Sequence, residues 1–239
     1  MDVFTRWKPF FCDDCRMSPT NARVIKPVAR EQLADAVIHI IGVTLAMLAV
    51  PVLITLAAVW RDEAAMIAAV SIYGATLLAM ILFSASYNLA VMRYPDWWLV
   101  QVLRRLDHGT IYLKIAGTYT PFAVIAGGQT GFWLLIGIWS AAATGFFGKM
   151  FAPDKWERAS IALYLLMGWA FVLAAGPISA SLTQATLVLI LVGGGLYTIG
   201  VVFHLWERLP YQNAIWHVFV LAASFVFYSA MIVEVVIGT

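Results

Sequence analysis

The sequence predicts an all-α integral membrane protein, a bundle of seven transmembrane helices, and three observations support this fold class. Of the 239 residues, 62% are hydrophobic and only 12% are charged, with a mean hydropathy of +0.86. A soluble domain ordinarily carries about 25% charged residues. Seven apolar segments are each long enough for a span of about 20 residues. The connections between them are short, so consecutive helices are expected to lie antiparallel in one bundle.

The predicted helices form one membrane domain, residues 31–239, which follows a polar and basic tail, residues 1–30. The expected spans cover residues 34–59, 65–92, 108–127, 130–149, 159–177, 183–206 and 213–236. No internal repeat is evident, which argues against a transporter built from duplicated halves. The tail has no short apolar core followed by small residues, so we expect no signal peptide.

The tail holds the only two cysteines of the chain, Cys12 and Cys15. Two thiols cannot complete a zinc site without other ligands, and this segment suggests no packed scaffold for a redox pair. We interpret them as an incidental surface pair under reducing conditions. The basic residues of the tail predict at most a modest contact with an anionic inner leaflet.

Lysine and arginine residues concentrate on one side of the predicted bundle. Beside those of the tail, the even-numbered connections carry Arg93, Arg104, Arg105, Lys149, Lys155, Arg158 and Arg208. The odd-numbered connections hold only Arg61. Because cytoplasmic loops retain positive charge, the amino-terminus is expected inside and the carboxy-terminus outside, in a multi-pass protein of the plasma (inner) membrane. This orientation is opposite to that of G-protein-coupled receptors. The net charge of +2 gives no reason to expect binding to nucleic acid.

The first two helices carry polar residues toward the inner face. In the first helix, His39 follows Glu31 and Asp35 in an i, i+4, i+8 stripe. Acids in a first helical turn also have a purely structural explanation, because the helix dipole favours them there. The second helix has Ser84 and Asn88 near its inner end. A serine in such a position can instead bond to the backbone of its own helix.

The third helix is expected to open with Asp107 and His108, where the acid is either a functional group or a helix cap. Lys114 follows on nearly the same face, about 10 Å deeper. A lysine at that depth must pair with another group, extend its amine toward the interface or lose its proton.

The sixth helix closes with His204 and Glu207, which a plain interfacial position would also explain. The seventh opens with Asn213 and His217, one helical turn apart on the same face. All four histidines therefore fall in the cytoplasmic third. A buried charge costs about 2.5 to 3.5 kcal/mol at mid-membrane, so such groups normally face the bundle interior or a wet cavity. Polar groups from several helices at one depth predict a shared pocket that opens inward.

Four stretches of the chain, in order, resemble the bacterial hemolysin III proteins. They are "EQLADAVIHIIG" (31–42), "SASYN" (84–88), "LDHGTIYLKIAGTYTPF" (106–122) and "YTIGVVFHLWERLPYQNAIWHVFVLAAS" (197–224). That family is grouped with the progestin and adipoQ receptors, including the adiponectin receptors, and more distantly with alkaline ceramidases. The resemblance runs from about Glu31 to the carboxy-terminus and implies a seven-helix bundle with its amino-terminus inside.

The resemblance also implies a zinc site near the cytoplasmic face. In the family it is built from a Ser-x-x-x-His in the second helix, an Asp in the third and a His-x-x-x-His in the seventh. A zinc ion held there would lower the pKa of its bound water toward 7, which suits amide hydrolysis. The matching positions in this chain are Ser84, Asn88, Asp107, Asn213 and His217.

Only His217 keeps an imidazole at these ligand positions, and Phe227 stands where bacterial members commonly have a further histidine. An amide oxygen is a poor substitute for imidazole toward zinc. The sequence therefore predicts a retained pocket whose zinc is absent or altered. His39 and His108 remain open as replacement ligands. One hypothesis is that Lys114 faces Asp107 and supplies the missing positive charge; another is that an amide network with His217 and Ser84 closes the pocket.

Three functions are compatible with these residues. The first is a role in membrane or lipid homeostasis or in sensing, with a membrane lipid or an amphipathic small molecule as the ligand. The second is hydrolysis of lipid amides, with Asp107 and His217 as acid and base toward water. The third is a cytolytic pore, which the family name implies and which such apolar helices do not favour.

Overall fold

The computed structural model describes residues 30–238, apart from 153–156, 174–179 and 207. Cys12, Cys15 and Glu207 lie outside the described residues, so the predictions about them and about the tail stay predictions. Within this part, the chain forms the helices α1 (Arg30–Trp60), α2 (Ala64–Arg93), α3 (Leu99–Ala126), α4 (Gly128–Phe151), α5 (Glu157–Leu173), α7 (Gln184–Leu205) and α8 (Gln212–Val236).

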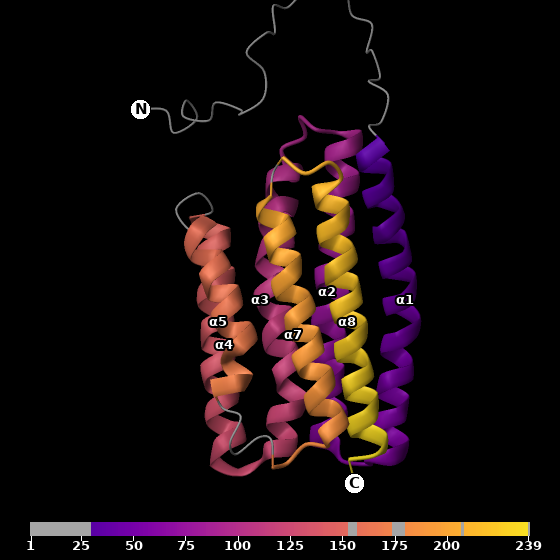
Figure 1. Ribbon diagram of the computed structural model, residues 1–239, viewed down its shortest axis with the longest axis vertical. Coiled ribbons are helices and arrows are strands. Elements are labelled where there is room, and N and C mark those ends of the chain that lie inside the picture. The colour runs from indigo at the N-terminus through magenta and orange to yellow at the C-terminus, as the bar shows by residue number, and fades with distance from the viewer. Residues whose placement is uncertain (1–29, 153–156, 174–179, 207, 239) are drawn as a thin grey trace, which may run out of the picture.

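The helices alternate in direction and form one bundle (Figure 1). Helix α8 packs against both α7 and α1, which brings the first and last helices of the chain side by side. Helix α3 packs against α2 and α4 and contributes the largest set of buried residues. Helix α1 begins at one end of the bundle and α8 finishes at the other. This arrangement places the start of α1, the end of α2 and the start of α8 at the same end.

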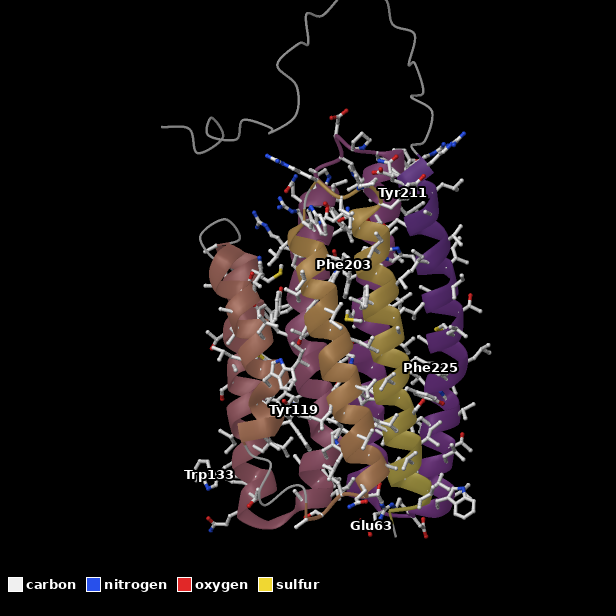
Figure 2. The ribbon with its side chains drawn as sticks, viewed as in Figure 1. Glu63, Tyr119, Trp133, Phe203, Tyr211 and Phe225 are labelled. Atoms are coloured by element: carbon white, nitrogen blue, oxygen red, sulfur yellow. The ribbon has the colours of Figure 1, made fainter. Side chains whose placement is uncertain are left out.

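Five of the described helices, α1, α2, α4, α7 and α8, are long and apolar enough to cross a membrane. Their surfaces expose large apolar side chains such as Leu48, Val59 and Phe225, as expected for surfaces in contact with lipid. Phe225 is labelled in Figure 2. The prediction of an all-α membrane protein is therefore confirmed. Helix α3 is less apolar because it carries Asp107 and Lys114, and both of these side chains are buried inside the bundle.

Helix α3 begins at Leu99, so the start predicted at residue 108 is wrong. Its first turns are amphipathic, with Val100 buried and with Gln101 and Arg104 exposed. Such turns are missed when a helix is located by apolar length alone. Asp107 consequently lies two turns inside the helix, and it is not the cap that was one of its two interpretations.

Candidate polar site at one end of the bundle

A cavity of about 370 Å³ lies inside the bundle, with its polar groups gathered toward the end where α1 and α8 begin. Its lining includes every residue for which the sequence predicted a role in the site: His39, Ser84, Asn88, Asp107, His108, Lys114, Asn213 and His217. Away from this end the walls are mainly apolar, with Met80, Phe122 and Ile190 among them. The cavity thus combines a polar end with an apolar body.

Three side chains from α1 and α8 converge at the polar end. The Asp35 carboxylate lies 2.5 Å from His217 Nδ1 through one oxygen and 3.6 Å from His39 Nδ1 through the other. The two imidazole rings meet edge to face, with their centroids 4.4 Å apart. Asp35 and His39 share one face of α1 because they are one turn apart, and the packing of α8 on α1 brings His217 to them.

Helices α2 and α3 complete the polar end. His39 Nε2 lies 3.0 Å from the Ser84 hydroxyl and 3.5 Å from the amide nitrogen of Asn88, which also donates to the Ser84 carbonyl oxygen. The Asp107 carboxyl group lies near enough to Ser84, Asp35 and His217 for each of them to influence its charge. Ser84 and Asp107 are both almost fully buried. The Ser84 hydroxyl therefore contacts the imidazole of His39 and lies near the carboxyl group of Asp107.

Lys114 is buried deeper, with 2% of its surface exposed, and lies among aromatic rings. Its Nζ is 5.0 Å from the ring centre of Phe227, 5.2 Å from that of Tyr197 and 5.7 Å from that of Tyr73. Among the ion pairs of the described residues, none joins Lys114 to Asp107. Cation–π attraction inside the bundle is the contact the structure shows for this amine.

The residues at the family's zinc-ligand positions do not fit that ion. Asn88 uses its amide nitrogen as a donor to Ser84 and is turned toward His39, and Asn213 is exposed. His217 alone offers an imidazole. His108 lines the cavity, but it is not part of the cluster of Asp35, His39 and His217 found among the described residues.

Sequence reasoning misses the central position of Asp35, because a favourable interaction with the helix dipole is enough to explain an acid in the first turns of a helix. The four-residue spacing of Asp35 and His39 could have indicated this position, because an acid one helical turn before a histidine lies on the same face and can belong to the same site. What the sequence could not reveal is that α8 packs on this face of α1 and brings a second imidazole to the same carboxylate.

The protein therefore belongs to the class of polytopic membrane proteins that have a polar site inside the helix bundle. Its apolar helices surround a cavity, and titratable groups cluster at one end of that cavity. The family model described as Haemolysin-III related matches residues 29–228. This protein belongs to that family. It is 39% identical to Hemolysin-3 of Bacillus cereus over 82% of this chain and 87% of the relative.

Two further relatives support the assignment. The Hemolysin-3 homolog of Bacillus subtilis (strain 168) is 38% identical, over 82% of this chain and 90% of the relative. The human Monocyte to macrophage differentiation factor is 28% identical over 90% of this chain and 88% of the relative. The human match extends the relationship beyond bacteria, in agreement with the resemblance to the progestin and adipoQ receptors.

Proposed function

We propose that this protein binds a membrane lipid or another amphipathic small molecule in its cavity, and that it acts in membrane or lipid homeostasis or in lipid sensing. The observation that carries the proposal is the distribution of residues in the cavity lining: acids and histidines gather at one end, and the remaining walls are mainly apolar apart from Lys114 and a few hydroxyl groups. A volume of about 370 Å³ is in the range of small-molecule pockets. A single-chain amphiphile matches such a cavity, with its head at the polar end and its tail along the walls.

The proposal includes seven membrane crossings, with the polar end of the cavity toward the cytoplasm. Helix α3 has 28 residues, which gives a length of about 42 Å at 1.5 Å per residue. That length exceeds the roughly 30 Å of a bilayer core. Its neighbours α2 and α4 are apolar enough to cross, and α3 packs between them. Helix α5, with 17 residues, stands beside α4 in the same bundle.

Filling the cavity tests the proposal. Gly194 lines the cavity, and a Cβ placed on it would meet nothing within 4 Å, so Gly194→Leu adds bulk without a clash near the backbone. We expect detergent-purified Gly194→Leu to bind radiolabelled palmitate at least about ten-fold more weakly than the wild type, a loss of roughly 1.4 kcal/mol. Scintillation proximity counting measures this.

The matched control is Gly195→Leu on the same helix. A Cβ at Gly195 also meets nothing within 4 Å, but this residue is not part of the cavity lining. Its palmitate binding should equal that of the wild type. Equal binding by both variants, or no saturable binding by the wild type to palmitate, to hexadecanol or to lysophospholipid, would contradict the proposal.

A second candidate function is the hydrolysis of lipid amides, favoured by the position of Asp107 beside Ser84 and near His217. In that reaction, Asp107 or His217 takes a proton from water as the water attacks the amide carbonyl. The other of these two residues gives a proton to the departing amine. Incubation of the protein with ceramide in vesicles, followed by mass spectrometry of the released fatty acid, tests it. Release that Asp107→Asn abolishes would support hydrolysis; no release above that of protein-free vesicles would exclude it for this substrate.

The third candidate, a cytolytic pore, is suggested by the names of the two Bacillus relatives. Its test is leakage of an encapsulated dye from vesicles that contain the protein. Leakage that scales with protein content would support it. Vesicles that retain the dye would leave the lipid-binding proposal as the better one.

A further inference from the structure

The cluster of Asp35, His39 and His217 has the composition of a metal site. One ligand atom from each of these residues lies within 4.8 Å of the others. We propose that these three residues bind a divalent transition metal ion of the zinc class. In this chain, the ligand set has moved from the family positions occupied by Asn88 and Asn213 to the first turns of α1.

A backbone hydrogen bond of His39 indicates which of its ring nitrogens can bind a metal. His39 Nδ1 lies 2.8 Å from the backbone carbonyl oxygen of Asp35, which can only accept a hydrogen bond. Nδ1 therefore carries the hydrogen, and Nε2 keeps its lone pair. A histidine that binds a metal usually donates its second ring nitrogen to a carbonyl or carboxylate oxygen in this way, which fixes the tautomer and the ring orientation.

The hydroxyl of Ser84 adds a second argument. Its single hydrogen can be donated to only one acceptor; His39 Nε2 is 3.0 Å away, and the carboxyl group of Asp107 lies nearby. A cation that takes the Nε2 lone pair removes this competition, because the hydroxyl then donates to Asp107. A bound cation would thus leave the Ser84 hydroxyl free to donate to the nearby carboxyl group of Asp107.

The charge of the cluster also favours a cation. Asp35 is 5% exposed, and the ion pairs that it forms within the described part of the chain are both with imidazoles. Oxygen from carboxylate and nitrogen from imidazole are zinc ligands, and three protein ligands leave a coordination position for water or a bound molecule. The i, i+4 spacing of Asp35 and His39 replaces the i, i+4 pair of the family's seventh helix, and α8 now supplies a single imidazole.

The experiment measures metal content, which does not depend on any activity. Full-length protein purified in detergent is stripped with EDTA, dialysed against Zn²⁺ and examined by elemental mass spectrometry. We expect about one ion per chain, as for a site with one set of three ligands. Reloading with Co²⁺ gives a second readout, since a cobalt ion bound by imidazoles and a carboxylate in a low-symmetry site has a strong visible spectrum.

Three variants assign the ligands. Asp35→Asn, His39→Gln and His217→Gln should each weaken metal binding by more than ten-fold, because loss of even an outer partner of a ligand costs about 10- to 100-fold. His108→Gln removes a histidine from the same cavity outside the cluster, and Asn213→Ala alters a family position. Both of these controls should bind the metal as the wild type does.

Two results would overturn the assignment. One is a wild-type protein that retains no metal after loading, and the other is metal that survives Asp35→Asn and His39→Gln but is lost in Asn213→Ala. The wild-type measurement stands even if a variant fails to fold. Palmitate binding by the stripped protein separates this proposal from the proposed function, because either result can hold without the other.

Discussion

At the scale of single residues, Lys114 shows how a lysine side chain is accommodated inside an apolar bundle. Three aromatic rings surround its amine at 5.0 to 5.7 Å, and a desolvated cation–π contact contributes about 2 kcal/mol or more. The same side chain lines the cavity. An anionic head group that enters the cavity would therefore find a cation whose charge is not already neutralised by an acid among the described residues.

This arrangement predicts a preference for anionic amphiphiles. We expect wild-type protein to favour palmitate over hexadecanol, and Lys114→Leu to reduce this preference about ten-fold, since hydrogen bonds to charged groups contribute about 1.5 to 3 kcal/mol. Competition between the two compounds in the binding assay measures the ratio. Lys114→Arg should retain the preference, because it keeps the charge. An unchanged ratio in Lys114→Leu would show that the amine has no part in selecting the ligand.

At the scale of helices, the turn between α3 and α4 depends on glycine. Gly127 and Gly128 adopt positive φ angles of 61° and 53°, which side chains disfavour. One turn later, a Cβ on Gly131 would stand 2.1 Å from the backbone oxygen of Ala123. A backbone oxygen cannot rotate away as the end of a side chain can, so the two helices must separate if this position is enlarged.

We expect Gly131→Ala to destabilise the protein by about 1 to 3 kcal/mol, the usual cost of overpacking. Gly137→Ala on the same helix is the control, because its Cβ would meet nothing within 4 Å. The two variants are compared by thermal unfolding in detergent, with the loss of monodisperse protein as the readout. Equal midpoints would mean that α3 and α4 can shift apart at little cost.

Sequence reasoning predicted the helices well wherever apolar length alone defines them, as for α4 and α7. It failed at the start of α3, whose first turns are amphipathic, and it could not pair residues from different helices. His217 and Asp35 are separated by 182 positions, and only the packing of α8 on α1 brings them together. For the same reason, the sequence offers Asp107, on the same helix, as one hypothetical partner of Lys114, whereas the rings around its amine come from α2, α7 and α8.

At the scale of the whole molecule, a second polar cluster closes the end of the bundle opposite the cavity's polar end. Glu234 is 1% exposed, and its carboxylate accepts hydrogen bonds from the backbone nitrogen of Thr183 at 3.3 Å and from its hydroxyl at 3.1 Å. Arg61 donates to the backbone oxygens of Glu234 and Gly238. These contacts tie the connection after α1 to the residue that caps α7 and to the end of α8.

Removal of the Glu234 carboxylate should destabilise the end of the bundle that holds this second polar cluster. We expect Glu234→Ala to lower stability by about 1 to 3 kcal/mol, because it removes a buried carboxylate and leaves the part-buried backbone N–H of Thr183 without its acceptor. Glu63→Ala removes an exposed acid from the same end (Figure 2) and should have little effect. Thermal unfolding of both variants in one detergent gives the comparison. A Glu234→Ala protein as stable as Glu63→Ala would mean that the cluster contributes nothing to closure.

The charges at the two ends predict how the whole molecule sits in the membrane. Arg93, Arg104, Arg105 and Arg208 belong to the end that holds the polar groups of the cavity, whereas the far end has Arg61, whose guanidinium is engaged by backbone oxygens. Positive charge is retained on the cytoplasmic side, so the cavity's polar end should face the cytoplasm. A ligand head group, or a metal bound by Asp35 and the two histidines, would then exchange with the cytoplasm.

The native cysteines make this orientation measurable. Cys12 and Cys15 should react with a membrane-impermeant maleimide only after spheroplasts are permeabilised, because the tail is expected inside. In a protein with both cysteines changed to serine, Glu63→Cys at the opposite end should react in intact spheroplasts. The reverse pattern would place the polar end outside, and the head group and any metal would then come from the external medium.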